Sequence, residues 1–347
     1  MKAVVVHGKD DLRVEEVPDP VTDPDDVLVE MEWGGICGSD VSYWKHGASG
    51  TAVLKDPLIL GHEVAGHVVE IGAGAAAEAE RLGVREGTRV TIHPATPVGD
   101  HAMPADLAER TNLWPEVRYF GSAAFSPHEH GGFARLRTVR PDQLRVVPDR
   151  VSTKEAALAE PFGVALHAVA RAGDLSGRSV LVNGSGPIGA LVVAAARAKG
   201  AGTIYASDLS PAALEIARKM GADHTVNPAS GDALPQDVEV AFEASGAPKA
   251  LGGVIAAVRR GGVIVQVGNL PAGEVSAALG NLVTREIDYR GSYRFVDEIS
   301  DALRLMADGV DVSPLMTHEV ELVEAAHGFG LAADRSTGSS KVMLKLS

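Results

Sequence analysis

The glycine-rich segment GSGPIG, residues 184–189, constrains the fold of this chain more than any other feature. An apolar run that predicts a buried strand comes directly before it, and a helical pattern follows at once. A G-x-G-x-x-G segment in this setting is typical of a dinucleotide-binding βαβ unit. Gly184 permits the tight turn, Gly186 lets a pyrophosphate approach the backbone, and Gly189 allows the helix to pack closely on the strand. The alternative is a structural glycine turn that binds no ligand.

The residue that would choose the cofactor is Asp208, about 20 residues after the glycine segment, at the end of the next predicted strand. Its carboxylate would accept hydrogen bonds from the adenosine ribose hydroxyls and would repel a 2′-phosphate. Residues 209–213 contain no arginine that could neutralise such a phosphate. We therefore expect NAD rather than NADP.

Strand and helix patterns alternate through the second part of the chain. A capping box at residues 152–155 predicts the start of an alanine-rich helix. Apolar strands separated by helices predict a parallel sheet that is covered on both faces. The expected strands are residues 179–183, 203–206, 225–226, 238–242 and 263–267, and the expected helices are residues 187–199 and 212–220.

The first part of the chain, to about residue 149, has a mostly β pattern. Short strands separated by Gly, Pro and Asp predict a small sandwich or barrel. Residues 341–346 also predict a strand, and we expect this end of the chain to pack onto the first domain. The expected strands of the first part are residues 3–7, 27–31, 58–60, 64–71, 89–92 and 143–147.

A candidate metal site lies in this β region. His62 and Glu63 follow the predicted strand 58–60, and Cys37, the single cysteine, lies 25 residues before His62. Thiolate, imidazole and carboxylate are all good zinc donors. Neighbouring residues of a regular strand point to opposite faces, so the pair meets one ion only where the backbone turns, as Gly61 and Gly66 permit. The alternative is a polar pair at a strand end.

The region between residues 94 and 132 has no regular pattern and predicts a long irregular lobe. A lobe of this length inside a compact domain usually has a function or packs on a partner. It contains His101, His128 and His130, which we interpret as surface residues; a second metal site is the alternative.

Composition excludes several classes of protein. The 347 residues suffice for two domains, and a formal net charge of −14 argues against binding to nucleic acid. One cysteine allows no internal disulfide. The N-terminus does not have the pattern of a signal peptide, and the longest apolar stretch, residues 187–198, is interrupted by Arg197. We therefore expect a cytoplasmic protein that does not associate with membranes.

On these motifs the chain resembles a zinc-dependent medium-chain dehydrogenase of the polyol (sorbitol) dehydrogenase branch. The matching segments are GGICGSD (residues 34–40), GHEVAGHVVEIG (61–72), AEPFGVALHA (159–168) and GSGPIG. Two more, RYFGSAAFSPHEHGGF (118–133) and RGSYRF (290–295), are similar to L-idonate 5-dehydrogenases. The resemblance implies an α/β protein with a chaperonin-10-like (GroES-like) β catalytic domain, residues 1–153 and 295–347, and an inserted Rossmann domain, residues 154–294.

The resemblance also assigns roles to residues. Cys37, His62 and Glu63 match the catalytic zinc ligands, while Glu160 is either a fourth ligand or a neighbour linked to the metal through water. Pro161 after Glu160 predicts an extended backbone at Glu160. Asp40 matches an acid that orients the zinc histidine, and Ser39 a hydroxyl of the proton relay. Residues that hold substrate are Tyr43, Arg294 and Phe120; those that bind the cofactor are Gly184, Gly186, Pro187, Ile188, Gly189, Asp208, Val267, Gly268, Asn269, Ser292 and Tyr293.

The chain departs from the family pattern in two places. It lacks the four cysteines with which many relatives hold a structural zinc in the lobe, so we expect one zinc per subunit. Five residues after the ribose acid, where the family often has an arginine, it has Ala213, which bears on the tightness of NAD binding.

The expected reaction is oxidation of a secondary hydroxyl of a polyol or aldonate to a ketone, with L-idonate to 5-ketogluconate preferred. Zinc would polarise the hydroxyl, Ser39 and solvent would carry the proton, and nicotinamide would accept the hydride. Sorbitol, xylitol, galactitol, threonine and butanediol are alternative substrates, and a catalytically inactive nucleotide-binding relative is an alternative of another class. The family implies a homo-oligomer, either a dimer or a tetramer.

Overall fold

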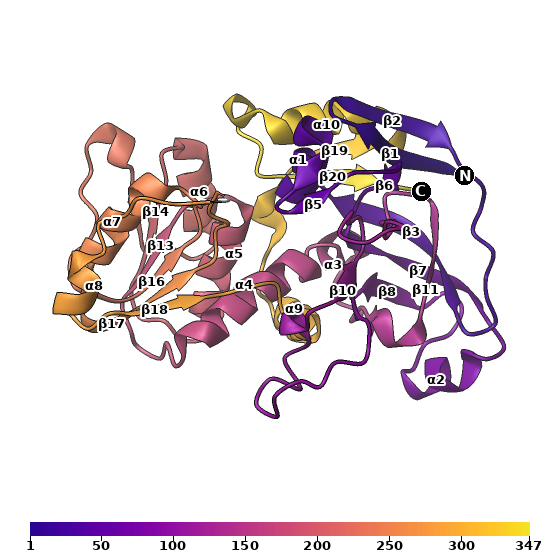
Figure 1. Cartoon of the computed structure of the whole chain (residues 1–347), viewed down its shortest axis with the longest axis horizontal. Helices are drawn as coiled ribbons and strands as arrows, with labels where there is room; N and C mark the ends of the chain where they lie inside the picture. Colours follow the sequence, from indigo (N-terminus) through magenta and orange to yellow (C-terminus); the bar gives the residue numbers. More distant parts are fainter. Residues whose placement is uncertain (272) are drawn as a thin grey trace. The chain divides into compact units, whose positions relative to one another are not determined.

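The computed structural model describes residues 1–271 and 273–347, which form two compact units (Figure 1). The first unit combines Met1–Glu160 with Ile299–Ala307 and Met316–Ser347. The second unit contains Pro161–Glu298 and Asp308–Leu315. Both ends of the chain therefore belong to the first unit. No helix in the described ranges is long and apolar enough to cross a membrane.

A mostly antiparallel sheet dominates the first unit. Its strand order is β12-β8-β7-β3-β20-β19, and β11 also pairs with β3. In the central strand β3 (Val27–Gly35), Val27, Val29 and Met31 are buried and alternate with partly exposed residues. This alternation places every second side chain in the apolar core of the unit. The other strands are β7 (Glu63–Ile71), β8 (Arg89–Ile92), β11 (Leu136–Val139), β12 (Leu144–Val146), β19 (Met316–Glu321) and β20 (Lys341–Lys345).

The C-terminal strand β20 completes this sheet. It pairs antiparallel with β3, so that Leu344 lies opposite Gly34. Four of its five residues are buried. The expectation that the end of the chain packs onto the first domain is thus confirmed, and the β architecture predicted from the short strands is also confirmed.

The remaining elements of the first unit are short. A three-stranded sheet has the order β2-β1-β6, and β4 pairs with β5. The elements are β1 (Lys2–Gly8), β2 (Asp11–Glu16), α1 (Gly38–His46), β4 (Ala48–Ser49), β5 (Ala52–Val53), β6 (Leu58–Ile59), α2 (Ala76–Arg81), η2 (Pro141–Gln143), α3 (Thr153–Ala156), η5 (Leu322–Glu324), α10 (Ala325–Ala333) and η6 (Arg335–Thr337).

The lobe at residues 94–132 is more ordered than expected. It contains β9 (Ala95–Pro97), which pairs antiparallel with β10 (Val117–Tyr119), and the short helix η1 (Thr111–Leu113). The prediction of a lobe without regular structure was therefore wrong in part. Strands of three residues are too short to give a visible periodicity in the sequence.

The second unit contains a six-stranded parallel sheet of order β15-β14-β13-β16-β17-β18. Numbered along the chain, this is the 3-2-1-4-5-6 order of a Rossmann fold, which confirms the predicted fold class. Helices α5 and α7 cover opposite faces of the sheet (Figure 1). The strands are β13 (Val180–Asn183), β14 (Ile204–Ser207), β15 (His224–Val226), β16 (Val238–Glu243), β17 (Val258–Gln266) and β18 (Asp288–Gly291).

Helix ends in the second unit follow their capping residues. The hydroxyl of Ser210 accepts a hydrogen bond from the backbone N–H of Ala213 at the start of α6. Ser152 caps only the short helix α3, and a separate helix begins at Ala159. The elements are α4 (Ala159–Ala172), which begins in the first unit, α5 (Pro187–Ala198), α6 (Pro211–Lys219), η3 (Pro228–Ser230), α7 (Pro248–Ala257), α8 (Gly280–Thr284) and η4 (Ser313–Leu315). Helix α9 (Glu298–Ala307) belongs to the first unit except for Glu298.

Candidate metal centre and nucleotide site

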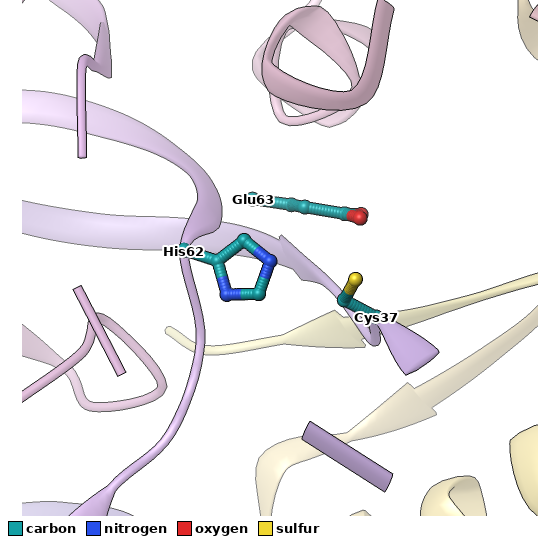
Figure 2. A group of neighbouring side chains, drawn as sticks. All are labelled: Cys37, His62 and Glu63. Carbon is teal, nitrogen blue, oxygen red and sulfur yellow. The ribbon is translucent and has the colours of Figure 1, made fainter. Parts of the chain in front are cut away.

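Cys37, His62 and Glu63 meet in the first unit, and one ligand atom from each lies within 4.8 Å of the other two. Figure 2 shows the imidazole, the carboxylate and the thiol turned toward a common space. Pairing of β3 with β7 causes this convergence, because Gly35 lies opposite Glu63 and Cys37 follows two residues later. The sequence prediction that these three residues lie together is met by the geometry.

The turn that allows adjacent His62 and Glu63 to share one site lies at Gly61. Its φ of +98° is in the left-handed region that favours glycine. A Cβ there would also lie 2.2 Å from the ring of Phe133. Gly66, in contrast, lies inside β7, so its expected role in the turn was wrong. A Cβ at Gly66 would lie 1.9 Å from the carbonyl oxygen of Glu30, so glycine there permits close approach of two strands.

Asp40 connects two of the candidate ligands. It is completely buried; its Oδ2 accepts the backbone N–H of Cys37 at 2.9 Å, and its Oδ1 accepts that of Gly61 at 3.2 Å. The same Oδ1 lies 3.8 Å from Nδ1 of His62. Burial raises the pKa of Asp40, against the opposing influence of His62. Asp40 therefore holds the backbone on both sides of the site and faces the imidazole.

The groups around His62 shift the pKa of its imidazole. Burial lowers the pKa of His62, but Asp40 and Cys37 raise it, and the net effect is a pKa well above the ordinary value. A site in which the neighbours stabilise positive charge this strongly also favours a bound cation. Metal coordination requires the neutral imidazole, so a metal ion would replace the proton.

Glu63 makes an ion pair with Lys341, a residue that the sequence analysis missed. Nζ of Lys341 donates to Oε1 of Glu63 at 2.7 Å, and both side chains are buried. Burial lowers the pKa of Lys341, but Glu63 and Cys37 raise it more. A lysine at an inward position of the apolar strand KVMLK was the available signal. The other carboxylate oxygen, Oε2, is buried and finds no hydrogen-bond partner within the described ranges.

This donor set fits a zinc ion. One sulfur, one imidazole nitrogen and one carboxylate oxygen are three protein ligands of the types that catalytic zinc uses, and three ligands leave one position open. A buried carboxylate oxygen without a partner is costly in a protein interior unless something else satisfies it. A cation between Cys37, His62 and Glu63 would do so.

Glu160 lies in the same unit but outside the group of three. Its Oε1 accepts a hydrogen bond from the hydroxyl of Tyr119 at 2.5 Å, and Tyr119 packs edge-on against the ring of His62. Burial raises the pKa of Glu160. The expected extended backbone at Glu160 was wrong, because Glu160 lies in the first turn of α4. Pro161 is tolerated there because the first turn of a helix does not need its missing N–H.

Tyr43 and Phe120, two predicted substrate residues, are buried in the first unit. The hydroxyl of Tyr43 accepts the backbone N–H of Ala123 at 2.9 Å. The guanidinium of Arg137 lies 4.8 Å from the centre of the Phe120 ring. Ser39, the predicted relay residue, is partly exposed in the first turn of α1.

Two of the three lobe histidines, His128 and His130, accept hydrogen bonds from the backbone, and His101 lies beside Glu116. Nε2 of His128 accepts the N–H groups of Lys55 and Asp56, at 2.9 and 3.1 Å. Nδ1 of His130 accepts the N–H of Ile59 at 3.1 Å. His128 is buried, so the expectation of a surface residue was wrong for it. These bonds fix residues 55–59, which lead to the metal centre.

In the second unit, Asp208 lies directly beside the glycine segment. Its Oδ2 accepts the N–H of Ser185 at 2.7 Å, and its Oδ1 accepts that of Ser210 at 2.8 Å. A Cβ at Gly189 would lie 1.7 Å from the carbonyl oxygen of Gly184, so helix and turn touch there. At Gly186 a Cβ would meet nothing within 4 Å, and this residue is the N-cap of α5, followed by Pro187 and Ile188. The backbone there is open to a phosphate at a helix N-terminus.

Glu243 holds the loops at the same edge of the sheet, and the sequence analysis also missed this residue. Its buried carboxylate accepts the amide of Gln266 at 2.6 Å and the N–H of Gly246 at 3.1 Å. Its carbonyl accepts the N–H groups of Val267 and Gly268. Glu243 thus holds the backbone of Val267 and Gly268, the first two residues of the predicted cofactor segment that ends at Asn269.

The last predicted residues follow β18. The N–H of Ser292 donates to the carbonyl of Gln266 at 3.0 Å, so Ser292 lies beside the end of β17. Tyr293 is half exposed, and the guanidinium of Arg294 lies 5.0 Å from the centre of its ring. The left-handed φ of +50° at Arg294 turns the chain at this point.

Comparisons with known proteins identify the family of this chain. Residues 23–149 match the family "Alcohol dehydrogenase GroES-like domain", and residues 187–308 match "Zinc-binding dehydrogenase". Sorbitol dehydrogenase of Bacillus subtilis (strain 168) is 35% identical over 99% of this chain and 97% of its own. The crystal structure of L-idonate 5-dehydrogenase from Escherichia coli K-12 superposes with a TM-score of 0.90 at 35% identity, covering 99% of this chain and 97% of that one. A zinc-binding dehydrogenase of Sinorhizobium meliloti 1021, bound to NADP, has a TM-score of 0.88 at 30% identity, covering 99% and 98%.

Proposed function

The chain belongs to the zinc-dependent dehydrogenases with a GroES-like catalytic domain, and on that premise we propose that it oxidises a secondary hydroxyl of a polyol or aldonate to a ketone with NAD. The favoured reaction is L-idonate to 5-ketogluconate. The observation that carries the proposal is the meeting of Cys37, His62 and Glu63 within 4.8 Å.

In this proposal Cys37, His62 and Glu63 hold one zinc ion, and Asp40 keeps His62 in place through the backbone of Gly61. When bound, zinc would supply a Lewis acid for the substrate hydroxyl, and nicotinamide would supply the acceptor for the hydride. The unpartnered Oε2 of Glu63 supports this assignment for the described chain.

Proton handling is assigned to Glu160 and Ser39. Glu160 is buried beside His62 and Tyr119, and burial raises its pKa above the ordinary value, which favours a carboxyl group that can hold a proton. Ser39 is partly exposed, so its hydroxyl can pass a proton to solvent. Glu160 acts here beside the metal, with Tyr119 as its fixed partner.

Cofactor choice is assigned to Asp208. A related protein of this fold, from S. meliloti, binds NADP, so the fold does not by itself fix the choice between NAD and NADP. We assign this choice to the residue beside the adenosine ribose. In this chain that residue is a carboxylate, which accepts ribose hydroxyls and repels a 2′-phosphate. Its position 2.7 Å from the N–H of Ser185 places it at the turn of the glycine segment.

The substrate is assigned from a smaller set of observations. Arg294 supplies a guanidinium that can pair with a sugar-acid carboxylate, and this favours an aldonate. The similar L-idonate 5-dehydrogenase supports the same choice. Sorbitol is the second candidate, because the sorbitol dehydrogenase of B. subtilis matches over nearly the whole chain.

We also propose a homo-oligomer, either a dimer or a tetramer. Strand β18 is the last in its sheet, so its outer edge faces no other strand of the described chain. Tyr289 in β18 itself and Val283 in α8 are exposed large hydrophobic residues. An open strand edge that carries an exposed hydrophobic side chain is suited to pairing with a second copy. Light scattering of the purified protein measures the oligomeric state.

The test of function is a substrate screen on zinc-loaded protein with NAD and with NADP. The substrates are L-idonate, D-sorbitol, xylitol, galactitol, 2,3-butanediol and L-threonine. We expect the highest kcat/KM with L-idonate and NAD, and loss of activity in Cys37→Ser. Activity that survives unchanged in Cys37→Ser would exclude the proposed centre, while a preference for sorbitol would change only the substrate.

A further inference from the structure

The buried lysine of β20 has no role in the function described so far. Lys341 is 2% exposed, and its Nζ donates to Oε1 of Glu63 at 2.7 Å and to the carbonyl oxygen of Ile36 at 3.2 Å. Lysine is rarely buried unless it is paired. Both partners lie next to the candidate metal ligands, since Ile36 precedes Cys37.

The second oxygen of the Glu63 carboxylate, Oε2, lies over Gly35. A Cβ at Gly35 would lie 2.3 Å from Oε2 of Glu63 and 3.3 Å from Cδ of Lys341. The space above Gly35 is therefore filled by the carboxylate itself. Gly35 lies in β3 outside the left-handed region, so its conformation does not require glycine, whereas the space above it does.

We propose that Lys341 and Gly35 form a seat that fixes the carboxylate of Glu63 for metal binding. The ammonium holds Oε1, and the missing Cβ of Gly35 leaves room for Oε2, which has no hydrogen-bond partner among the described residues. The inference rests on the proposed function, in which Glu63 is a zinc ligand. Lys341 is a positioning residue, because it acts on the metal through Glu63.

Two physical effects connect this seat with the affinity for a metal ion. A glutamate side chain loses considerable rotamer freedom when it is fixed, and a seat that fixes it before the metal arrives removes that cost from binding. The charge-assisted hydrogen bond from Lys341 is strong and directional in a buried site. Groups that orient a metal ligand in this way typically change metal affinity 10–100-fold when removed.

The rival explanation is a buried ion pair that serves the fold alone. Loss of one partner of such a pair destabilises the protein but leaves an intact metal site unaffected. The two explanations differ in the metal affinity of a variant that still folds.

The test uses Lys341→Met and Gly35→Ala in the full chain. Lys341→Met keeps the length of the side chain and removes its charge. Gly35→Ala keeps the charge of Lys341, and its Cβ would displace the Oε2 end of the Glu63 side chain and press on Cδ of Lys341, both of which are side-chain atoms. Lys345→Met is a matched control on the same strand, because Lys345 is about half exposed. Gly8→Ala is the matched glycine control, because a Cβ at Gly8 would meet nothing within 4 Å.

Two readouts are independent of activity. Zinc affinity is measured by competition with a chelator of known affinity, and the visible spectrum of cobalt(II)-substituted protein reports the ligand set. We expect Lys341→Met and Gly35→Ala to bind zinc about 10–100-fold more weakly than wild type and to change the cobalt bands. Both controls should stay within about threefold of wild type on the same assay.

The outcomes separate this inference from the proposed function. If wild type holds zinc and both seat variants keep its affinity and cobalt spectrum, the inference is overturned while the function stands. If only Gly35→Ala changes, Lys341 serves the fold alone and the proposed seat is wrong. If wild type binds no zinc, or if Cys37→Ser binds as much zinc as wild type, both proposals fail. If Lys341→Met does not fold, Lys341→Arg replaces it: near-wild-type zinc affinity supports the role of the charge, and no rescue overturns it.

Discussion

The hydroxyl of Tyr119 donates a hydrogen bond of 2.5 Å to Oε1 of Glu160. This partner distinguishes the two buried glutamates of the metal centre. Glu160 accepts its hydrogen bond from a neutral phenol, that of Tyr119. In Glu63, one carboxylate oxygen accepts a hydrogen bond from the ammonium of Lys341, and the described residues supply no partner for the other. Glu63 is therefore the better candidate for a permanent ligand, and Glu160 for a group that handles protons.

The two glutamates should respond differently to removal. Glu63→Ala should lose most of its zinc because a direct ligand is gone. Glu160→Ala should keep its zinc yet turn over about 100-fold more slowly, because a proton-transfer group contributes about that much. Zinc titration and kcat of both variants measure this, with Tyr119→Phe as the control that leaves the carboxylate in place. Zinc loss in Glu160→Ala with retention in Glu63→Ala would mean that the roles are reversed.

Metal content should be about one zinc per fully loaded subunit. The lobe histidines are engaged elsewhere, since His128 accepts two backbone N–H groups and Nε2 of His101 lies 3.2 Å from Glu116. Elemental analysis after dialysis checks the number. Two tightly held zinc ions, one of them lost in His128→Ala, would establish a site in the lobe.

Cofactor preference should depend on the charge of Asp208. We expect wild type to prefer NAD over NADP at least about tenfold in kcat/KM, because the carboxylate repels the 2′-phosphate. Asp208→Asn keeps the size of the side chain and an oxygen for the N–H of Ser185, and it should reduce the preference mainly by improving NADP. Kinetics with both cofactors decide this, and equal use of the two by wild type contradicts the assignment.

The turn at Gly61 should tolerate no side chain. Gly61→Ala combines a left-handed backbone with a Cβ 2.2 Å from the buried ring of Phe133, and should destabilise the unit by roughly 2–4 kcal/mol. Gly83→Ala is the control, because Gly83 has φ +72° but open space, and should cost only about 1 kcal/mol. Urea unfolding measures both, and equal losses would show that Phe133 plays no part.

Acid should weaken one ion pair of the second unit. Burial raises the pKa of Glu298, but hydrogen bonds with His167 (2.6 Å) and the N–H of Val296 outweigh it and leave the pKa below the ordinary value. The stabilisation is therefore fully present above the unfolded pKa, about 4.3, and is lost as the pH falls through the folded pKa.

Glu298→Gln should thus be less stable than wild type at pH 7 by about 1.5–3 kcal/mol, the contribution of hydrogen bonds to a charged group. The difference should shrink as the pH falls from the unfolded pKa, about 4.3, through the lower folded pKa, because the carboxylate of wild type becomes protonated over that range. Urea unfolding across this pH range tests the sign. A difference that stays constant down to pH 3 would indicate that the charge of Glu298 does not contribute.

The sequence alone determined the Rossmann sheet and the glycine turn, and it predicted the residues of the candidate metal centre. The first two features depend on chemistry that is local in the chain, because a strand, a glycine segment and a helix follow one another and Asp208 comes about 20 residues later. For Cys37, His62 and Glu63 the residue types are those of zinc ligands, but the resemblance to a family was needed to prefer a metal site over a polar pair at a strand end.

Only the tertiary structure decided which partners the buried charges have. Lys341 is 278 residues from Glu63 in sequence, and Tyr119 is 41 from Glu160. The register of β20 on β3 brings the first pair together, and a shift of one residue would turn Lys341 to the other face. Burial makes each unpaired charge costly, so the fold selects these partners, but the selection depends on strand register and burial that no local motif encodes.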